Sequence, residues 1–340
     1  MIGGIGIPTI IIAVFWIMVL IGAHFVGMSV QVLLSDTLRR VGMNGVLVLA
    51  MVPAIQSGTG PNFALPVGIV CGLFAMVCSI ELNLTGVPWL LASVFFSVPL
   101  AVIAGYIYGK LLNAVKGSEM TIATYTGFSV CALMSLVWLS IPFKNPKMGW
   151  LMGQGLRETI QLDAVGGAQI LNNFLKFDIG GVVIPTGMFL VFGLLSALVW
   201  LFFRSKTGIA ISAGGLNSKF AQAAGLDIDR GRVWANVLST VLGAIGIIIY
   251  SQSFGYAQLY IAPLMMAFPA VAAVLVGGAT ASRANVLNVV IGVFLLQGLF
   301  TTAMPVANEI FRGTDLSEIM RVIIQNGIIL YALTQVKRGA

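Results

Sequence analysis

Charged side chains are scarce in this sequence. Asp, Glu, Lys and Arg together make up 9% of its 340 residues, whereas soluble domains carry about 25%. Hydrophobic residues make up 59%, and the mean hydropathy is +1.01. The core of a soluble domain cannot use so much apolar surface, so the composition excludes a water-soluble protein and favours the bilayer as the solvent. We predict an all-α integral membrane fold, with residues 1–340 forming a single domain.

Residues that carry chemistry are few as well. Histidine occurs once, at His24, and the three cysteines lie inside hydrophobic runs without the spacing of a metal or redox motif. No nucleophile is paired with a base, and no G-x-x-x-x-G-K-[ST] phosphate loop is present. The net charge of +7 lies in loops and at the C-terminus, as a topology signal would, and not as a nucleic-acid footprint. We therefore expect no enzyme, no metal site, no cofactor and no nucleic-acid partner.

The acidic residues gather at the ends of hydrophobic segments. Examples are Asp36, Glu81 and Glu119. Ion-coupled carriers usually hold ionisable residues inside the membrane as relays or ligands. This pattern argues against a built-in ion coupling device and favours a neutral solute.

Hydrophobic runs of the length of a transmembrane helix, roughly 20 residues, recur along the whole chain. Seven are clear, namely Pro8–Val30, Phe63–Leu82, Trp89–Lys110, Thr121–Ile141, Val182–Phe203, Trp234–Ser253 and Val286–Met304. Three are shorter or interrupted, namely Gly42–Ile55, Leu264–Gly277 and Ile319–Leu333. We predict about ten spans, and small-residue pairs such as Gly68 with Gly72 and Gly105 with Gly109 predict close helix packing.

Basic residues indicate the orientation, because Lys and Arg are enriched in cytoplasmic loops. With ten spans and a cytoplasmic N-terminus, most of the basic residues lie in cytoplasmic loops, including those of the loop 204–232. The segment 143–181 becomes an extracytoplasmic loop, partly helical, with Leu162, Val165 and Ile170 as apolar contacts. Arg39 and Arg40 are the main exception. Either they lie near the outer interface, or residues 31–60 do not form a simple span.

The loop 204–232 carries five basic and two acidic residues. Asn217 is a good N-cap for a helix of about two turns over residues 218–224, and Gly225 stands where a left-handed glycine would end it. Phe220, Ala223 and Ala224 offer an apolar knob. So short a helix is not stable alone in water, so it needs a packing partner, either another protein or its own subunit.

The segment from Pro53 to Asn62 contains two prolines and two glycines and cannot continue a regular helix. It is either an ordinary loop or an interrupted element beside a translocation path, since broken backbone at membrane depth must be buried or line a wet cavity. On the second interpretation, we expect Gln56, Asn62 and Phe63 to line the path.

Three motifs resemble those of a known family. The pattern T-G-x-x-x-x-A-x-G-x-N-x-x-x-A-x-x-x-G-I is matched at Thr207, Gly208, Ala213, Gly215, Asn217, Ala221 and Gly225, with Leu226 in place of Ile. The run PAVAAVLVGGATA at Pro269–Ala281 resembles an A-x-x-L-G-G-[TA]-S turn, and Gln325–Leu330 resembles a final I-x-x-G-x-I-L. In these motifs the chain is similar to permeases of the ribose, galactose, autoinducer-2 and nucleoside class of bacterial ABC importers.

The resemblance implies a dimer of ten-span subunits in the bacterial inner membrane, surrounded by lipid. An extracytoplasmic binding protein would deliver the substrate, and ATP-binding cassette subunits, which hold ATP and Mg, would dock on a cytoplasmic coupling helix. The resemblance places the coupling contact on Gly215, Asn217, Phe220, Ala221, Ala224 and Gly225.

One departure bears on the substrate. Sugar permeases of this class often carry G-G-I-D-L-S-V-G near the end of the second span, and the corresponding stretch Gln56–Gly68 lacks the Asp. A homodimer and a heterodimer with a second permease both stay open. We predict the permease subunit of an importer for a small neutral solute, of the monosaccharide kind. The alternatives are a nucleoside or riboflavin permease, and a secondary transporter or membrane scaffold without an ATPase.

Overall fold

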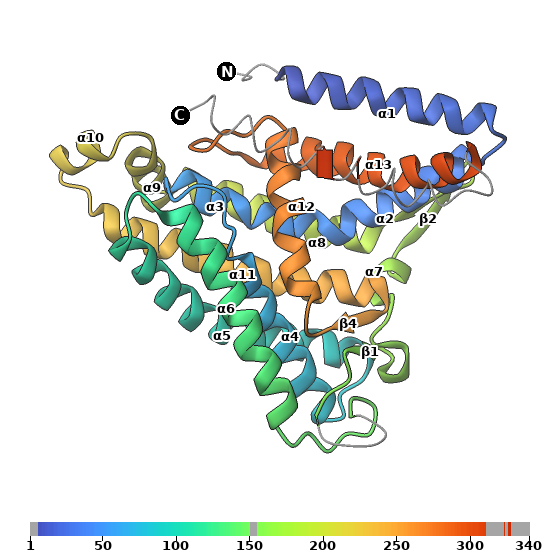
Figure 1. The fold of residues 1–340 in the computed structure, drawn as a ribbon, viewed down its shortest axis with the longest axis horizontal. Helices are drawn as coiled ribbons and strands as arrows, with labels where there is room; N and C mark the ends of the chain where they lie inside the picture. Colours follow the sequence, from blue (N-terminus) through green and yellow to red (C-terminus); the bar gives the residue numbers. More distant parts are fainter. Residues whose placement is uncertain (1–5, 150–154, 311–322, 324–325, 328–340) are drawn as a thin grey trace.

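The computed structural model describes residues 6–149, 155–310, 323, 326 and 327, and over these the chain is mainly α-helical (Figure 1). The apolar helices are α1 (Ile7–Phe25), α2 (Val30–Leu49) with α3 (Met51–Gln56), α4 (Leu65–Glu81), α5 (Gly86–Ala114), α6 (Glu119–Ser140), α8 (Thr186–Arg204), α11 (Ile228–Phe254), α12 (Ala262–Val276) and α13 (Val286–Ile310). By length and composition, six of these could cross a membrane, counting α2 and α3 as one, and α1, α4 and α12 are shorter. The chain is therefore an all-α, multi-pass membrane protein, as predicted. The tenth predicted span lies almost wholly outside the described residues.

Helix α11 is the centre of the packing. It is mostly buried and contacts α2, α4 and α5, whereas α5, α6 and α8 leave most of their apolar surface open, as helices facing lipid do. Glycines bring the backbones together. A Cβ on Gly105 would lie 2.9 Å from the Cα of Val237, and a Cβ on Gly72 would overlap the carbonyl of Ala244. The close packing predicted from the small-residue pairs is confirmed.

Helix α2 begins much earlier than the hydropathy predicted. The predicted span started at Gly42, but the helix starts at Val30. Leu33, Thr37 and Val41 recur every four residues and are buried, which is the spacing of one helix face. The intervening charged residues lower the mean hydropathy and hide this face. As a result, Arg39 and Arg40 lie within a helix that continues to Gln56 and not in a loop.

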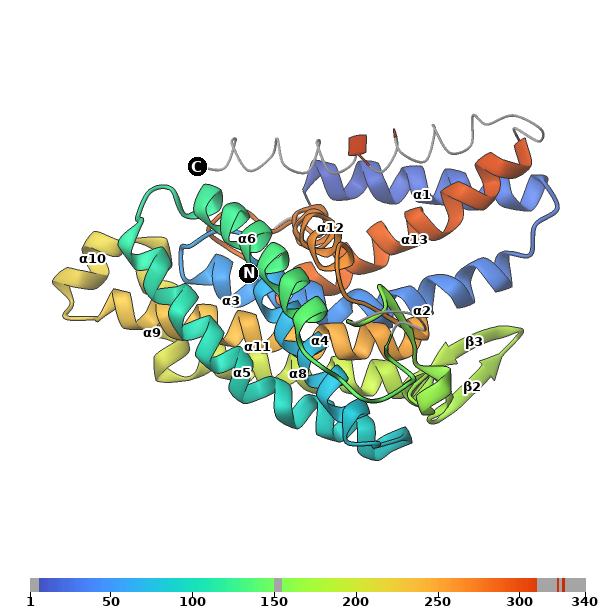
Figure 2. The same cartoon turned by 60° about the horizontal axis from the view of Figure 1, so that its bottom comes forward.

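Two small antiparallel sheets lie at one end of the molecule, opposite α9 (Lys206–Leu216) and α10 (Ser218–Ala223) (Figures 1 and 2). Strand β1 (Thr159–Gln161) pairs with β4 (Tyr256–Gln258), and β2 (Lys176–Ile179) pairs with β3 (Val182–Pro185). We call this end the strand end and the other the α10 end.

The predicted outer segment 143–181 lies at the strand end. Over its described residues, 143–149 and 155–181, the helical content is limited to the 3₁₀ turn η1 (Asp163–Val165) and to α7 (Ile170–Asn173). Leu162 and Val165 are buried in the main core and Ile170 packs against it, as predicted. The segment is thus a folded cover tied to β4 and not a loose loop.

Candidate functional site

The loop 204–232 folds as predicted around a short capped helix. The Asn217 side-chain oxygen accepts a hydrogen bond from the backbone N–H of Phe220 at 3.0 Å. Helix α10 follows over Ser218–Ala223, and Gly225 has a φ of +78°. This left-handed residue ends the helix as a C′ glycine does. Local sequence therefore determines α10.

Helix α10 buries little of its own apolar surface. Ala221 is fully buried against the chain, but Phe220 is 69% exposed and Leu216, at the end of α9, is 51% exposed. Ala223 and Ala224 are also exposed. The predicted apolar knob therefore stands free of its own subunit, at least within the described part of the chain.

Helix α9 was not predicted. Ser205 caps it, with its hydroxyl accepting from the backbone N–H of Gly208 at 3.3 Å. Its glycines Gly208, Gly214 and Gly215 disfavour a helix in isolation. However, a Cβ on Gly208 would overlap the carbonyl of Phe202 at the end of α8, and a Cβ on Gly215 would overlap the carbonyl of Gln56. Packing therefore overrides propensity here, and the loop is a pair of helices in place of one.

Ion pairs fix the base of this loop. Lys116 pairs with Asp229, and Glu119 pairs with Arg232, whose side chain is only 10% exposed. Asp227 caps α11 by accepting from the N–H of Arg230 at 3.0 Å. The two ion pairs connect the turn between α5 and α6 to the start of α11, at the base from which α9 and α10 project.

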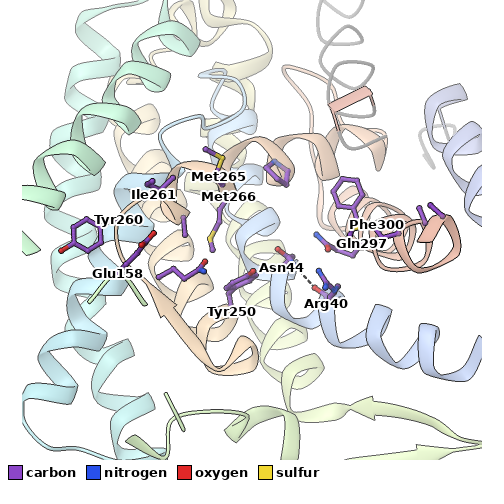
Figure 3. Close-up of a pocket in the computed structure, with 16 residues that line it drawn as sticks. Arg40, Asn44, Glu158, Tyr250, Tyr260, Ile261, Met265, Met266, Gln297 and Phe300 are labelled. Carbon is purple, nitrogen blue, oxygen red and sulfur yellow. Dashed lines mark hydrogen bonds between the residues drawn. The ribbon is translucent and has the colours of Figure 1, made fainter. Parts of the chain in front are cut away.

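A cavity of about 650 Å³ lies nearer the strand end, between α2, α11, α12, α13 and β4 (Figure 3). Polar groups and apolar groups share its wall. The polar ones are Arg40, Asn44, Glu158, Gln258 and Gln297, with the hydroxyls of Tyr250 and Tyr260. The apolar ones include Ile261, Met265, Met266 and Phe300. Mixed walls of this kind and size are typical of small-molecule sites.

Arg40 is the most unusual residue of this wall. It comes from the interior of α2, and Asn44, one turn on, donates to its backbone carbonyl at 3.0 Å. Among the described residues, no carboxylate lies within ion-pair distance of its guanidinium. Figure 3 shows Glu158 on the opposite side of the cavity. The side chain of Arg40 is exposed, and it belongs to a helix long and apolar enough to cross a membrane, where ionisable residues are usually functional.

The residues predicted to line the path lie elsewhere, near the α10 end. Asn62 is 2% exposed, and its side chain is held by Ser239, Tyr108 and the backbone of Ala64. Gln56 bonds to Ser212 and to the carbonyl of Ala284. Phe63 is half-buried, with its ring 5.6 Å from that of Phe268. None of the three lines the large cavity, and their role in a path stays a prediction.

The sequence analysis missed Arg40 as a site residue. Two signals could have found it. The buried face of Leu33, Thr37 and Val41 predicts a helix through this region, and an arginine inside a span points to a functional site by default.

Taken together, these features define a multi-pass helical membrane protein with a mixed polar cavity and a protruding pair of short helices. The sequence model of one family, described as "Branched-chain amino acid transport system / permease component", matches residues 16–333. The chain belongs to this family of ABC transporter permeases. Searches of curated proteins and of solved structures found no match.

Proposed function

We propose that this chain is the transmembrane subunit of a binding-protein-dependent ABC importer in a bacterial inner membrane. It carries a small neutral polar solute of the monosaccharide kind by alternating access, powered by a separate ATPase. The observation that carries the proposal is the cavity between α2, α11, α12 and α13 at one end of a permease whose other end presents a free apolar helix.

The wall of the cavity supports a sugar-like solute. Asn44, Gln258 and Gln297 offer both donors and acceptors, and the guanidinium of Arg40 offers several donors. Hydroxyl groups of a sugar need such directional partners on several sides. The rings of Tyr250 and Phe300 offer flat apolar surfaces for its C–H faces.

The α10 end supports docking of an ATPase. Basic residues outnumber acidic ones there, which favours the cytoplasmic side. The basic ones are Lys110, Lys116, Arg204, Lys206, Lys219, Arg230, Arg232 and Arg283, against Glu119, Asp227 and Asp229. The ATPase subunit, which would bind ATP and Mg, docks on α9, α10 and the turn after them, where Asn217, Phe220, Ala224 and Gly225 are exposed. Of the other residues predicted for this contact, Ala221 is buried and Gly215 packs against Gln56, so these two hold the exposed residues in place. A second permease subunit and an extracytoplasmic binding protein at the strand end complete the assembly.

A nucleoside or flavin is the second candidate. The cavity wall includes Tyr250, Tyr260 and Phe300, and aromatic side chains stack on flat heterocycles. The family description names branched-chain amino acids. An amino acid would need its carboxylate and ammonium groups satisfied together, and the charged groups of Arg40 and Glu158 stand on opposite sides of the cavity.

The test begins with co-purification of the tagged chain from its native membrane and mass spectrometry of the bound subunits. We expect an ATPase and either two copies of this chain or a second permease. The complex is then reconstituted into liposomes with its binding protein and assayed for uptake of labelled monosaccharides and nucleosides. ATP-dependent uptake supports the importer. Uptake that needs no ATP would establish a secondary transporter, and the absence of both an ATPase and uptake would favour a scaffold.

A further inference from the structure

Gln56 joins three elements at the α10 end. It is the last residue of α3. Its side-chain oxygen accepts from the hydroxyl of Ser212 on α9, and its side-chain nitrogen donates to the carbonyl of Ala284, in the turn between α12 and α13. Ala284 itself is only 4% exposed. One amide group therefore bonds α9 on one side and the α12–α13 turn on the other.

Beside Gln56, the backbones of α3 and α9 are in direct contact, with no space for a side chain between them. A Cβ on Gly215 would overlap the carbonyl oxygen of Gln56, and a Cβ on Gly58 would lie 2.9 Å from the Cα of Gly215. Close-packed elements transmit displacement instead of absorbing it. A movement of α9 must therefore move the end of α3.

Each element joined at Gln56 leads to the cavity. Helices α2 and α3 form one nearly continuous helix that carries Arg40 and Asn44 into the wall, with Arg40 about 24 Å from Gln56 along the axis. Helix α12 contributes Met266 and helix α13 contributes Gln297. The same hydrogen-bonded group thus touches the α10 end of the helices that form most of the cavity.

We propose that Gln56 is the positioning residue that transmits movement of α9 and α10 to the cavity-lining helices. When α9 shifts, the amide of Gln56 carries α3 and the α12–α13 turn with it, and the cavity changes its access. The proposal rests on the proposed function, because it needs an ATPase that moves α9 and α10. It gives Gln56 a role in coupling and not in contact with the solute.

The test measures access to the cavity without needing a known solute. The three cysteines at positions 71, 78 and 131 are replaced by Ala, and Met266→Cys places one thiol in the cavity wall. Its labelling by a water-soluble maleimide is followed in the purified complex with its ATPase, with and without ATP and vanadate. In the parent protein, we expect the nucleotide to change the labelling rate about tenfold. In the Gln56→Leu protein, the change should be less than about twofold, and the basal rate of ATP hydrolysis should be the same as in the parent.

Gln252→Leu is the matched control. Gln252 is buried, whereas Gln56 is partly buried, and the amide of Gln252 likewise joins separate elements, because it bonds to Asn172 and to the backbone of Leu171 at the strand end. The same substitution there should keep the nucleotide-dependent labelling. Ser212→Ala removes only the hydroxyl that bonds Gln56. If the Gln56→Leu protein does not assemble with the ATPase, the Ser212→Ala protein tests the transmitting role of Gln56 in its place.

The outcomes separate the two proposals. If labelling responds to nucleotide in the parent protein and equally in the Gln56→Leu or Ser212→Ala protein, the transmitting role of Gln56 is overturned and the importer stands. If no ATPase accompanies the parent protein, the proposed function fails and the role of Gln56 fails with it.

Discussion

Gly58 and Gly215 touch backbone to backbone, where the turn after α3 meets the end of α9. A Cβ on Gly58 would lie 2.9 Å from the Cα of Gly215, and Gly58 has a φ of +77°. Neither position has room for a side chain. The contact joins two segments about half the chain apart, and it links the α9–α10 pair to the turn that follows the helix carrying Arg40.

Gly215→Ala should destabilise the protein. The added methyl overlaps the backbone of Gln56 and Gly58, and overpacking of this kind costs about 1–3 kcal/mol. Thermal unfolding in detergent measures the effect. Gly193→Ala is the control, since Gly193 also lies in a helix but a Cβ there meets nothing within 4 Å. Equal unfolding temperatures for the two variants would contradict the packing argument.

Phe220→Asp should separate the subunit from its ATPase without unfolding it. Phe220 is 69% exposed, and an exposed substitution changes stability by about 0.5 kcal/mol or less. A buried aromatic anchor in an interface is worth about 2 kcal/mol or more, so recovery of the ATPase in a pull-down should fall markedly. Gln222→Asp adds the same charge to an exposed residue of α10 outside the apolar knob and should matter less. Unchanged recovery with Phe220→Asp would remove α10 from the docking surface.

The features that could be predicted from the sequence are those that depend on residues close together along the chain. The ends of helix α10 are determined by an N-cap at Asn217 and a left-handed residue at Gly225, and both signals are local. The class of the protein follows from composition in the same way. The predicted start of α2 was wrong, because Asp36, Arg39 and Arg40 lower the mean hydropathy of a helix whose buried face is continuous.

The surroundings of Gln56 and Asn62 could not be predicted, because their partners are distant in sequence. Gln56 bonds to Ser212, 156 residues away, and Asn62 bonds to Ser239, 177 residues away. The composition of the segment predicts a broken helix from Pro53 onward, but the helix continues to Gln56 and the break lies between Gln56 and Leu65. Nothing in the composition reveals whether its amides face a solute or another helix, since either partner satisfies them equally well.

Asn62→Ala should lower stability. Asn62 donates to Ser239 at 2.8 Å and accepts from Tyr108 at 3.1 Å. Its loss would leave the buried Tyr108 hydroxyl without a partner, at a cost of about 1–3 kcal/mol. The measurements are thermal unfolding and uptake per folded protein, with Asn173→Ala at an exposed site as the control. Normal stability combined with a loss of uptake would instead support Asn62 as a lining residue.

Substitution of Arg40 tests whether the transported solute is neutral or anionic. In uptake by the reconstituted complex, Arg40→Gln keeps hydrogen-bonding groups but removes the charge. For a neutral solute, the substitution replaces a charge-assisted hydrogen bond of about 1.5–3 kcal/mol with a neutral one of about 0.5–1.5 kcal/mol, so KM should rise by roughly tenfold or less. For an anionic solute the attraction between the two opposite charges is lost as well, so KM should rise further. The adjacent Arg39→Gln is the control, because Arg39 pairs with Asp36 at 3.4 Å and does not line the cavity. An unchanged KM with Arg40→Gln would show that the solute does not meet this wall, and the path would then have to be sought nearer Asn62 and Phe63.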